Sequence, residues 1–273
     1  MLEGPDAVAF IQAQSMNDVK ALTDGQWHWN GLLNPKGRLI ALFALVRIHA
    51  GLLYLLLPDF PAEKLAVHLQ RFVFRSKVKL VLDKDSVFAS EFDISATSPA
   101  TRDHVSGDID SGLSLDFSSD AVSRRLWLFK SQSIANIDAD DGKQANWRDT
   151  DIMHGLPRLA ENQTEHWTPQ MLSLDRLNAF SLKKGCYPGQ EIVARTHYLG
   201  QAKRQTYLVE AGRLEVGGTV LRDQEKVGEI ICVTSKNATG LALLQSVSDS
   251  DSLASDKHPI HLLQALTGLQ RSN

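Results

Sequence analysis

The apolar run "LIALFALVRIHAGLLYLLLP" at residues 39–58 restricts the possible fold more than any other part of the chain. A membrane-spanning helix needs about 20 apolar residues with few or no charges, and Arg47, His49 and Gly51 interrupt this run. Two buried strands, at 39–48 and 52–58, fit the pattern better, because Gly51 can separate one strand from the next. We therefore expect a sheet with a buried strand pair, and no membrane segment.

The flanking segments predict further elements around this strand pair. The tetrad Asn34-Pro35-Lys36-Gly37 has Pro second and Gly last, which is typical of a type I turn. Apolar residues at helical spacing predict helices at 5–14 and 59–75. The second helix would place four apolar residues on one face, namely Leu65, Leu69, Phe72 and Val73. The alternation of charged and apolar residues in "KVKLVLD" (77–83) predicts a half-buried strand.

The middle of the chain is less strongly patterned. Ser and Asp are frequent in 93–125, where we expect a loop region with one strand, and "RRLWLFK" (124–130) predicts a better strand. The acidic stretch 137–146 predicts a solvated loop. Its "DADDG" cluster lacks the spacing and closing Glu of an EF-hand calcium site.

The pattern changes near residue 203 to short apolar runs divided by Gly and Asp, such as "TYLVE", "VGEIICVT" and "GLALLQSV". Short strands at regular spacing are typical of a small antiparallel barrel or sandwich. The sequence therefore predicts an α+β protein. A composite α+β body of two subdomains would occupy residues 1–202, and a C-terminal β domain would occupy residues 203–273.

Composition narrows the functional classes. Hydrophobic residues make up 43% of the 273 positions and charged residues 22%, which is ordinary for a globular protein. The net charge of −3 does not indicate a general polyanion binder. The two cysteines, Cys186 and Cys232, form no disulfide framework and no metal-ligand spacing, so we expect a reducing, cytoplasmic setting. The acidic start "MLEGPDAVAF" does not resemble a secretory signal.

The segment "KKGCYPGQEIVAR" at 183–195 carries the chemistry. Residues 183–204 contain five Lys or Arg and one Glu, and nearby positive charge favours a thiolate, so Cys186 is a candidate nucleophile. Gly185 and Gly189 permit backbone conformations that a side chain would obstruct. Tyr187-Pro188-Gly189 has the composition of a turn that could hold the thiol at a surface.

The residues alone leave three interpretations of this segment open: a reactive thiol, a binding loop, or a tight turn with an inert cysteine. His197 could act as the base of a thiol hydrolase, but no protease-type signature surrounds it, so a surface histidine is the simpler reading. Cys232 lies in the apolar run "EIICVT", which predicts a core residue. Nucleotide-binding and metalloprotease motifs are absent from the sequence.

The segment "KGCYPGQEIVART", followed by "LGQAKR", resembles the signature of the folate-binding YgfZ proteins, relatives of the glycine-cleavage T-protein, which is an aminomethyltransferase. The usual form is K-G-C-Y-x-G-Q-E, and residues 184–191 fit it without a break. Further matches are "GPDAVAFIQAQSMNDV", "NPKGRLIALFALVR", "FVFRSKVKL" and "GLPRL" with "TPQMLSLDRL". The resemblance covers most of residues 4–245.

The resemblance implies a cloverleaf of three domains around a central channel where folate binds, ending in an antiparallel β-barrel. It implies a role in the assembly or repair of iron–sulfur clusters, including those of enzymes that modify tRNA. The cluster would not be a permanent part of the protein, so no permanent metal is expected. The implied partners are tetrahydrofolate and iron–sulfur client or assembly proteins. From the negative net charge and the interrupted apolar run we expect no direct nucleic-acid binding and no membrane binding.

The resemblance also implies roles for single residues. Cys186 would be the reactive or cluster-handling thiol, with Lys184 and Arg195 favouring its thiolate. The folate-contacting or loop-shaping residues would be Gly185, Tyr187, Gly189, Gln190, Glu191 and Arg195.

The sequence departs from the resemblance at two positions. The T-protein needs a carboxylate in the strand after the hairpin, and the equivalent position here falls at Ala41 or Leu42. An apolar residue cannot hold a proton, so we do not expect aminomethyl transfer. Relatives often carry a pterin-binding Glu two residues before the glycine of the G-L-P segment, where this chain has Met153. Its absence predicts weaker folate binding, because an unpaired polar edge in a pocket costs about 1–3 kcal/mol.

The function expected from these observations is an accessory role in iron–sulfur protein maturation, with tetrahydrofolate as a ligand. The first alternative is an active folate-dependent one-carbon transferase, against which the apolar residues at 41–42 argue. The second is a non-catalytic binding module with an inert cysteine, which burial of Cys186 would favour.

Overall fold

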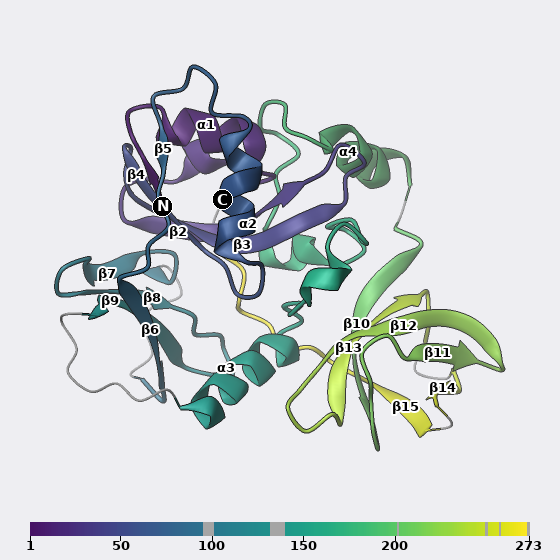
Figure 1. Cartoon of the computed structure of the whole chain (residues 1–273). Helices are drawn as coiled ribbons and strands as arrows, with labels where there is room; N and C mark the ends of the chain where they lie inside the picture. The colour runs from purple at the N-terminus through teal and green to yellow at the C-terminus, as the bar shows by residue number, and fades with distance from the viewer. Residues whose placement is uncertain (95–100, 132–139, 201, 249–250, 257, 272–273) are drawn as a thin grey trace.

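The computed structural model describes residues 1–94, 101–131, 140–200, 202–248, 251–256 and 258–271. Over these residues the strands form a five-stranded sheet, a four-stranded sheet and a closed six-stranded barrel (Figure 1). The predicted α+β class with a C-terminal antiparallel barrel is confirmed. Among the described helices, none is both long and apolar enough to cross a membrane.

The first sheet contains the predicted apolar strand pair. Its order is β2 (Gln26–Leu33), β3 (Leu39–His49), β4 (Leu52–Leu56), β1 (Leu2–Glu3) and β5 (Lys79–Leu80). The β2–β3 connection is the predicted turn, closed by a hydrogen bond from the N–H of Gly37 to the carbonyl of Asn34 (2.9 Å). The apolar run therefore became two neighbouring strands, as expected.

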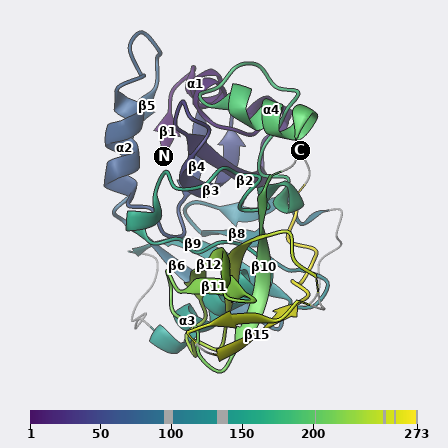
Figure 2. The same cartoon turned by 90° about the vertical axis from the view of Figure 1, so that its right-hand side faces the viewer.

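Both faces of β3 are buried, which explains why its sequence is continuously apolar rather than alternating. Ala41, Phe43 and Leu45 pack on one face with helices α1 (Ala7–Gln14) and α2 (Ala62–Gln70) and the short η1 (Val19–Ala21). Leu42, Ala44 and Val46 belong to a larger cluster on the other face. Figure 2 shows the sheet between these helices and the rest of the molecule.

The second sheet has the order β6 (Ser86–Phe92), β9 (Arg124–Lys130), β8 (Gly112–Asp116) and β7 (Val105–Asp108). Helix α3 (Asp141–Met153) lies between this sheet and the barrel (Figure 1). The segment after α3 contains two short turns of helix, η4 (Glu161–Gln163) and η5 (Leu174–Leu177), and leads to α4 (Gln190–Leu199).

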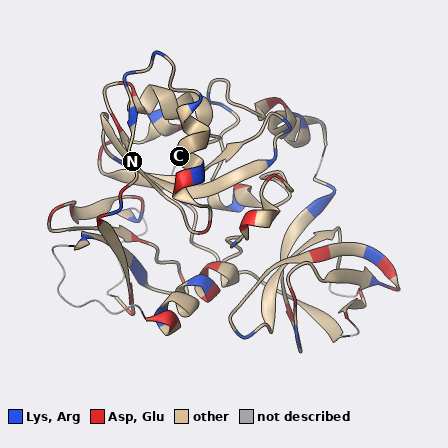
Figure 3. Cartoon of the chain, viewed as in Figure 1, with Lys and Arg blue, Asp and Glu red and all other residues tan. Residues whose placement is uncertain are grey.

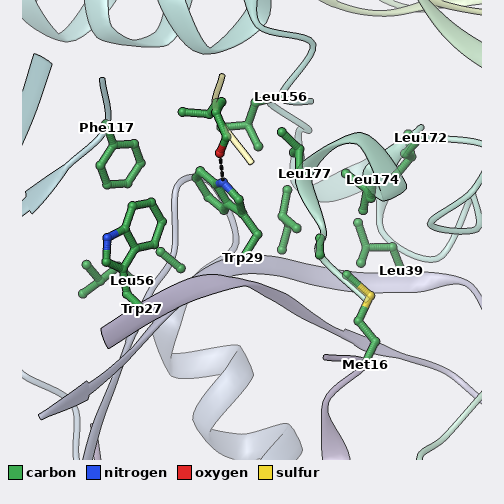
Figure 4. Packing of buried hydrophobic residues seen from close by; sticks show 14 of the residues in the cluster. Met16, Trp27, Trp29, Leu39, Leu56, Phe117, Leu156, Leu172, Leu174 and Leu177 are labelled. Carbon is green, nitrogen blue, oxygen red and sulfur yellow. Dashed lines mark hydrogen bonds between the residues drawn. The ribbon is translucent and has the colours of Figure 1, made fainter. Parts of the chain in front are cut away.

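The large cluster joins all three parts of the molecule. Figure 4 shows Trp29 of β2 at its centre, near Phe117, Leu156 and Leu177. Trp27 stacks on Phe117 with ring centroids 4.8 Å apart. The barrel contributes residues of its outer surface, including Cys232. Because one core is shared by segments far apart in the sequence, the position of each part depends on the others.

The barrel closes in the order β10 (Arg204–Ala211), β13 (Thr239–Gln245), β12 (Glu225–Val233), β11 (Thr219–Arg222), β14 (Leu253–Ser255) and β15 (His258–Leu263). The composition change near residue 203 coincides with the start of β10. Its interior is filled by apolar side chains such as Val209, Ile230 and Leu244.

Residues 264–271 leave the barrel and return to the body. The indole N–H of Trp29 donates to the carbonyl of Leu269 (3.1 Å), which is the dashed line in Figure 4. The buried Arg271 guanidinium donates to the carbonyl of Asp116 (2.6 Å) and lies 4.7 Å from the Trp27 ring centroid. The last described residues therefore stabilise the first two sheets rather than the barrel.

Two elements, α2 and β5, are shorter than the sequence predicted. The helix expected at 59–75 spans only Ala62–Gln70, so Leu65 and Leu69 are buried as expected but Phe72 is exposed. The chain then turns through Phe74, whose φ of 36° is left-handed. The strand expected at 77–83 is reduced to the two residues of β5.

The middle of the chain contains more regular structure than expected. The loop predicted at 93–125 includes β7 and β8, although residues 95–100 lie outside the described residues. The sequence also did not predict β6, whose half-exposed side chains give little apolar pattern.

The prediction of a loop at 137–146 was wrong for residues 141–146, which begin α3. Residues 137–139 lie outside the described part of the chain. The Asp140 carboxylate accepts the N–H of Lys143 (3.0 Å) and caps the helix. Asp140 and Asp141 therefore form a helix start, where Asp is favoured.

Candidate functional site

Cys186 lies on an exposed surface, as the sequence predicted, and Cys232 is buried in β12. Burial raises the pKa of the Cys232 thiol to about 11, so it is protonated at neutral pH. Cys186 borders an open hollow of about 430 Å³ between its own loop and α1, with Gln12, Asp18 and Lys20 on the opposite side. A buried Cys186 is thus excluded, and the thiol can meet a partner from outside.

Lys184, two residues before the cysteine, is buried although it borders the same hollow. It is 6% exposed, and its ammonium donates to the carbonyls of Gln12, Ser15 (2.6 Å) and Asn17 (3.0 Å). These carbonyls belong to the C-terminal end of α1 and the residues that follow it, where cations are favoured. Lys184 therefore fastens the Cys186 loop to α1, and its predicted influence on the thiol stays a prediction.

A buried polar network extends this attachment towards the first sheet. The side-chain amide of Asn17 donates to the carbonyls of Trp29 (2.8 Å) and Asn178 (2.7 Å). The Asn30 side chain accepts the N–H of Asn17 (2.9 Å) and contacts the His28 ring nitrogen Nε2 (3.2 Å). Burial, with a smaller effect of the Lys184 charge, lowers the pKa of His28 to about 3, so this ring stays neutral.

Burial lowers the pKa of Lys184 to about 8, partly opposed by Asp18. Its three carbonyl partners favour the charged form. At neutral pH the ammonium form therefore holds the loop.

The glycine turns of the two sequence motifs pack directly against each other. Gly189 has φ 79°, and a Cβ added there would lie 2.6 Å from the Asn34 carbonyl oxygen and 2.8 Å from the Cα of Gly37. Gly37 has φ 69°, and its Cβ would lie 2.8 Å from that of Ile192 in α4. Only glycine permits both the left-handed conformation and this approach. The hairpin motif and the cysteine motif thus form one structural unit.

The remaining predicted residues divide into two groups. Tyr187 is buried, with its ring 5.0 Å from the Lys184 ammonium, and burial raises the pKa of its phenol to about 12. The Gln190 amide donates to the carbonyl of Lys184 (3.2 Å). Glu191 and Arg195 are exposed on α4. The first group shapes the loop, and the second faces solvent.

Gly185 differs from Gly189, because an added Cβ would meet no atom within 4 Å and its φ is not in the left-handed region. The fold therefore does not require a glycine beside Cys186. A small residue there leaves the thiol open to approach.

A second candidate site is a cavity of about 360 Å³ between the first two sheets and α3. Aromatic rings from three elements line it: Trp29 from β2, Phe117 after β8 and Trp147 from α3. The buried Asp151 and the partly buried Arg158 supply its charged groups. Flat apolar walls with few polar groups are typical of a small-molecule site.

The polar groups of this cavity form a buried ion-pair network. The Asp151 carboxylate, 2% exposed, accepts from Arg124 (2.6 Å) and Arg158 (2.9 Å), and Arg158 also pairs with Asp59 (2.9 Å). Arg124 lies 4.3 Å from the Trp147 ring centroid. Burial alone would lower the pKa of Arg158, but the hydrogen bond to Asp59 and the charge of Asp151 raise it above its ordinary value.

Both positions at which the sequence differs from the family pattern lie in apolar surroundings. Ala41 and Leu42 are buried in β3 on opposite faces, and neither offers a proton-binding group. Met153 is half-buried against the large cluster, its carbonyl accepts the N–H of Leu266 (2.9 Å), and it is not among the residues that line the aromatic cavity.

Sequence reasoning missed the residues of the aromatic cavity. A signal was present in the charged residues of two otherwise apolar segments, the first Arg of "RRLWLFK" and the Arg of "GLPRL". Charges at such positions are rare unless paired, but the partners are not adjacent in the sequence. Outside the masked positions, no group of three or more His, Cys, Asp or Glu could hold a metal ion.

Comparison with known proteins places these observations in a family context. No protein-family model matches the chain. It is 26% identical over 259 residues to an uncharacterized protein of Haemophilus influenzae, covering 92% of this chain and 85% of that protein. It is 28% identical over 221 residues to the tRNA-modifying protein YgfZ of Colwellia psychrerythraea (77% and 68% covered). For YgfZ of Edwardsiella ictaluri, identity is 26% over 277 residues (92% and 81%).

The fold has a solved counterpart. The crystal structure of aminomethyltransferase T of the glycine cleavage system from Bartonella henselae superposes with a TM-score of 0.72, covering 97% of this chain and 82% of that one at 12% identity. Similarity at this identity shows the fold alone. The resemblance stated from the sequence is confirmed: this chain is related in sequence to the tRNA-modifying YgfZ proteins over most of its length and has the fold of the glycine-cleavage T-protein.

Proposed function

We propose that this protein assists the assembly or repair of iron–sulfur clusters in client enzymes, including enzymes that modify tRNA, in the reducing cytoplasm. The observation that carries this proposal is the exposed Cys186 thiol on a loop that Lys184 fastens to α1 and Gly189 fastens to the β2–β3 hairpin. The YgfZ name of the relatives supports the link to tRNA modification.

The geometry suits a thiol that meets its target briefly. A thiolate is both a nucleophile and a ligand for iron, and Cys186 is accessible from outside along an open hollow. Because the loop is fixed from two sides, little conformational entropy is lost when a client docks. Cys186 would contact the client's iron or cluster as a transient ligand, with the cluster as cargo.

The test compares the two cysteines in a strain that lacks the protein. Cys186→Ser should abolish rescue of cluster-dependent tRNA-modifying enzymes, and stability should change by no more than about 0.5 kcal/mol, because the residue is exposed. Cys232→Ser should retain rescue and lose about 1–3 kcal/mol, because it places a hydroxyl in an apolar site. Rescue is read from tRNA modification levels, and stability from urea unfolding.

Thiol labelling of the folded protein gives an independent check. Cys186 should react at neutral pH while Cys232 stays protected by its burial. Full rescue by Cys186→Ser, or faster labelling of Cys232, would refute the assignment of Cys186.

Folate-dependent aminomethyl transfer is the weaker alternative. The T-protein fold is present, but the strand that should carry the carboxylate has Ala41 and Leu42 instead. The buried carboxylate of the cavity, Asp151, already accepts from two guanidinium groups. An ion-paired carboxylate has a lowered affinity for protons and is a poor general base.

Tetrahydrofolate is nevertheless a proposed ligand, and the aromatic cavity fits it. Trp29, Phe117 and Trp147 would hold the faces of its flat ring, and Asp151 would accept from the donor edge, which it must share with Arg124 and Arg158. Bound folate would supply a one-carbon carrier. The residues of this chain would orient its ring and exclude water from it.

The sequence predicts that Met153 weakens folate binding. Because Met153 does not line the aromatic cavity, a gain from a carboxylate at this position requires bound folate to extend beyond the cavity. Calorimetric titration with tetrahydrofolate should therefore give a lower Kd for Met153→Glu than for the native protein, by roughly tenfold if the carboxylate gains one charged hydrogen bond. Met153→Gln, of similar size and uncharged, is the matched control. Equal affinities in the native and Glu proteins would contradict the prediction.

A further inference from the structure

The segment from the middle of α2 to β5 is the most one-sidedly charged stretch of the surface. Residues 64–82 contain five Lys or Arg and no Asp or Glu, although the whole chain carries a net charge of −3. Figures 1 and 3 show the connection after α2 as a projecting loop with cationic residues, at the end of the molecule away from the barrel.

Two aromatic rings are exposed in the same segment. Phe74 is 95% exposed and Phe72 41%, while Val73 between them packs against the core shared by α1 and α2. Phe74 also has a left-handed backbone (φ 36°), which is unfavourable for a bulky side chain. No described part of the chain covers the Phe74 ring to compensate for this unfavourable backbone. A strained backbone that presents an aromatic ring to solvent indicates a surface that meets a partner.

Most of the cationic side chains around these rings have no carboxylate partner among the described residues. Lys64 pairs with Glu161, and Lys79 lies opposite Glu3 in the sheet register. Arg71, Arg75 and Lys77 are exposed, and within the described ranges none of them pairs with a carboxylate. Two acids lie near this surface: Asp6, whose carboxylate accepts the backbone N–H of Lys77 (2.7 Å), and Glu165, whose charge acts on His68.

One of these cations is already arranged as a stacking platform. The guanidinium of Arg71 lies 5.7 Å from the centroid of the Phe72 ring. The centroid of the His68 ring, on α2, lies 5.5 Å from the same Phe72 centroid. Burial, followed by the Arg71 charge, lowers the pKa of His68, so this imidazole is neutral at pH 7. The Arg71 guanidinium also contacts His68 Nδ1 (3.2 Å). Neutral rings beside guanidinium groups that lack a carboxylate partner can stack on bases and contact phosphates.

We propose that this surface, formed by Arg71, Phe72, Phe74, Arg75 and Lys77, binds RNA directly and stacks on unpaired bases of a single-stranded loop. Charge complementarity selects a polyanion, and the two exposed rings select unpaired bases over a duplex, in which the bases are already stacked. This reverses the sequence-based expectation of no direct nucleic-acid binding, which rested on net charge.

An RNA loop suits the surface better than a membrane or an acidic protein. Membrane binding uses a continuous apolar helix face, but the apolar face of α2, with Leu65 and Leu69, is buried against the sheet. The exposed apolar groups are the two rings and the side chain of Val67 on α2, with Arg71 directly before the rings and Arg75 directly after them. An acidic protein would pair with the cations but does not require an uncovered ring at Phe74.

The inference goes beyond the proposed function, since it needs no cluster chemistry at Cys186. A protein that binds a tRNA loop could bring a cluster-handling thiol close to an enzyme working on the same tRNA. Figure 2 shows the loop after α2 and helix α4 on either side of α1, at the same end of the molecule. RNA binding and rescue can therefore be tested separately.

The experiment measures binding of the purified full chain to a fluorescent RNA hairpin with an unpaired loop, by anisotropy over a series of salt concentrations. The native protein should bind the hairpin more tightly than a fully paired duplex of equal length. Phe74→Ala should weaken hairpin binding about tenfold and remove the preference over duplex, because one base loses its stacking partner. Arg75→Gln should weaken binding to both RNAs and reduce the salt slope by roughly one phosphate contact.

The controls separate this surface from the rest of the molecule. Tyr198→Ala removes another exposed ring, 67% exposed on α4, and should leave binding unchanged. Cys186→Ser should also bind RNA as the native protein does, so a failure of the cluster hypothesis would not mimic a failure of this one. Phe74 is almost fully exposed, so its replacement should not disturb folding, which circular dichroism verifies.

Three outcomes would overturn the proposal. The first is no hairpin binding at low salt. The second is native affinity in Phe74→Ala. The third is tighter binding to anionic phospholipid vesicles or to polyglutamate, with the same dependence on Phe74 and Arg75, which would assign the surface to a membrane or an acidic protein.

Discussion

Replacing Asp151 with Asn should lower the free energy of unfolding by about 3–5 kcal/mol, the usual cost of leaving a buried charge without its partner. Arg124 is fully buried, and its only carboxylate partner among the described residues is Asp151. Asn is nearly the same size as Asp, so packing changes little, but two guanidinium groups lose a negative charge. Urea unfolding followed by circular dichroism measures the loss.

Asp149 on the same helix provides the matched control. Its carboxylate accepts from the backbone N–H (2.8 Å) and hydroxyl (2.6 Å) of Ser235 and pairs with no guanidinium of the described residues. Asp149→Asn keeps one side-chain oxygen as an acceptor and leaves no buried charge without a partner, so it should cost about 1 kcal/mol. If Asp149→Asn costs as much as Asp151→Asn, general disruption of α3 is responsible and the charge argument fails.

The double variant Arg124→Met/Asp151→Leu tests the cause more directly. Replacing both members of a buried pair by apolar residues is often nearly neutral for stability. The double variant should therefore be more stable than Asp151→Asn alone. A double variant that is the less stable of the two would show that the pair itself, and not the orphaned charge, stabilises the fold.

The parts of the fold that the sequence predicted well are those where burial shows in one segment. The apolar run at 39–58 is continuous because β3 packs on both faces, so its strands could be predicted without knowing what covers them. The type I turn at Asn34 and the barrel strands have local signals of the same kind. Each of these elements is specified by its own residues.

The errors lie where a local pattern is overruled by the tertiary structure. Phe72 continues the apolar spacing of α2, but the helix ends at Gln70 and leaves the ring exposed. The acidic residues near 140 resemble a loop, yet Asp140 caps a helix whose position depends on the barrel and the second sheet. A cap and a solvated turn use the same residue types.

The candidate site divides in the same way. The exposed Cys186 and buried Cys232 followed from the turn residues around one and the apolar residues around the other. The aromatic cavity could not be predicted, because Arg124, Asp151 and Arg158 meet only in the folded chain. The sequence also did not predict the partners of Lys184, which is two positions from Cys186 and donates to carbonyls of residues that follow α1.

Replacing Lys184 with Met should lower the free energy of unfolding by about 3 kcal/mol, because buried acceptors that lose a charged donor cost about 1–3 kcal/mol each and some of them can re-pair with water. The ammonium is the donor to three carbonyls at the end of α1, and it also lies against the Tyr187 ring. Met keeps the apolar stem of Lys, so the loss reports the hydrogen bonds rather than packing. Urea unfolding gives the value.

Lys183, its neighbour in the sequence, is exposed and makes a matched control, since Lys183→Met removes the same charge one residue away. That variant should change stability by no more than about 0.5 kcal/mol. At a temperature where Lys184→Met is still folded, its Cys186 labelling rate separates two roles for Lys184. A native rate with lost stability would make Lys184 purely an attachment of the loop, whereas a slower rate with unchanged stability would show that its charge acts on the sulfur instead.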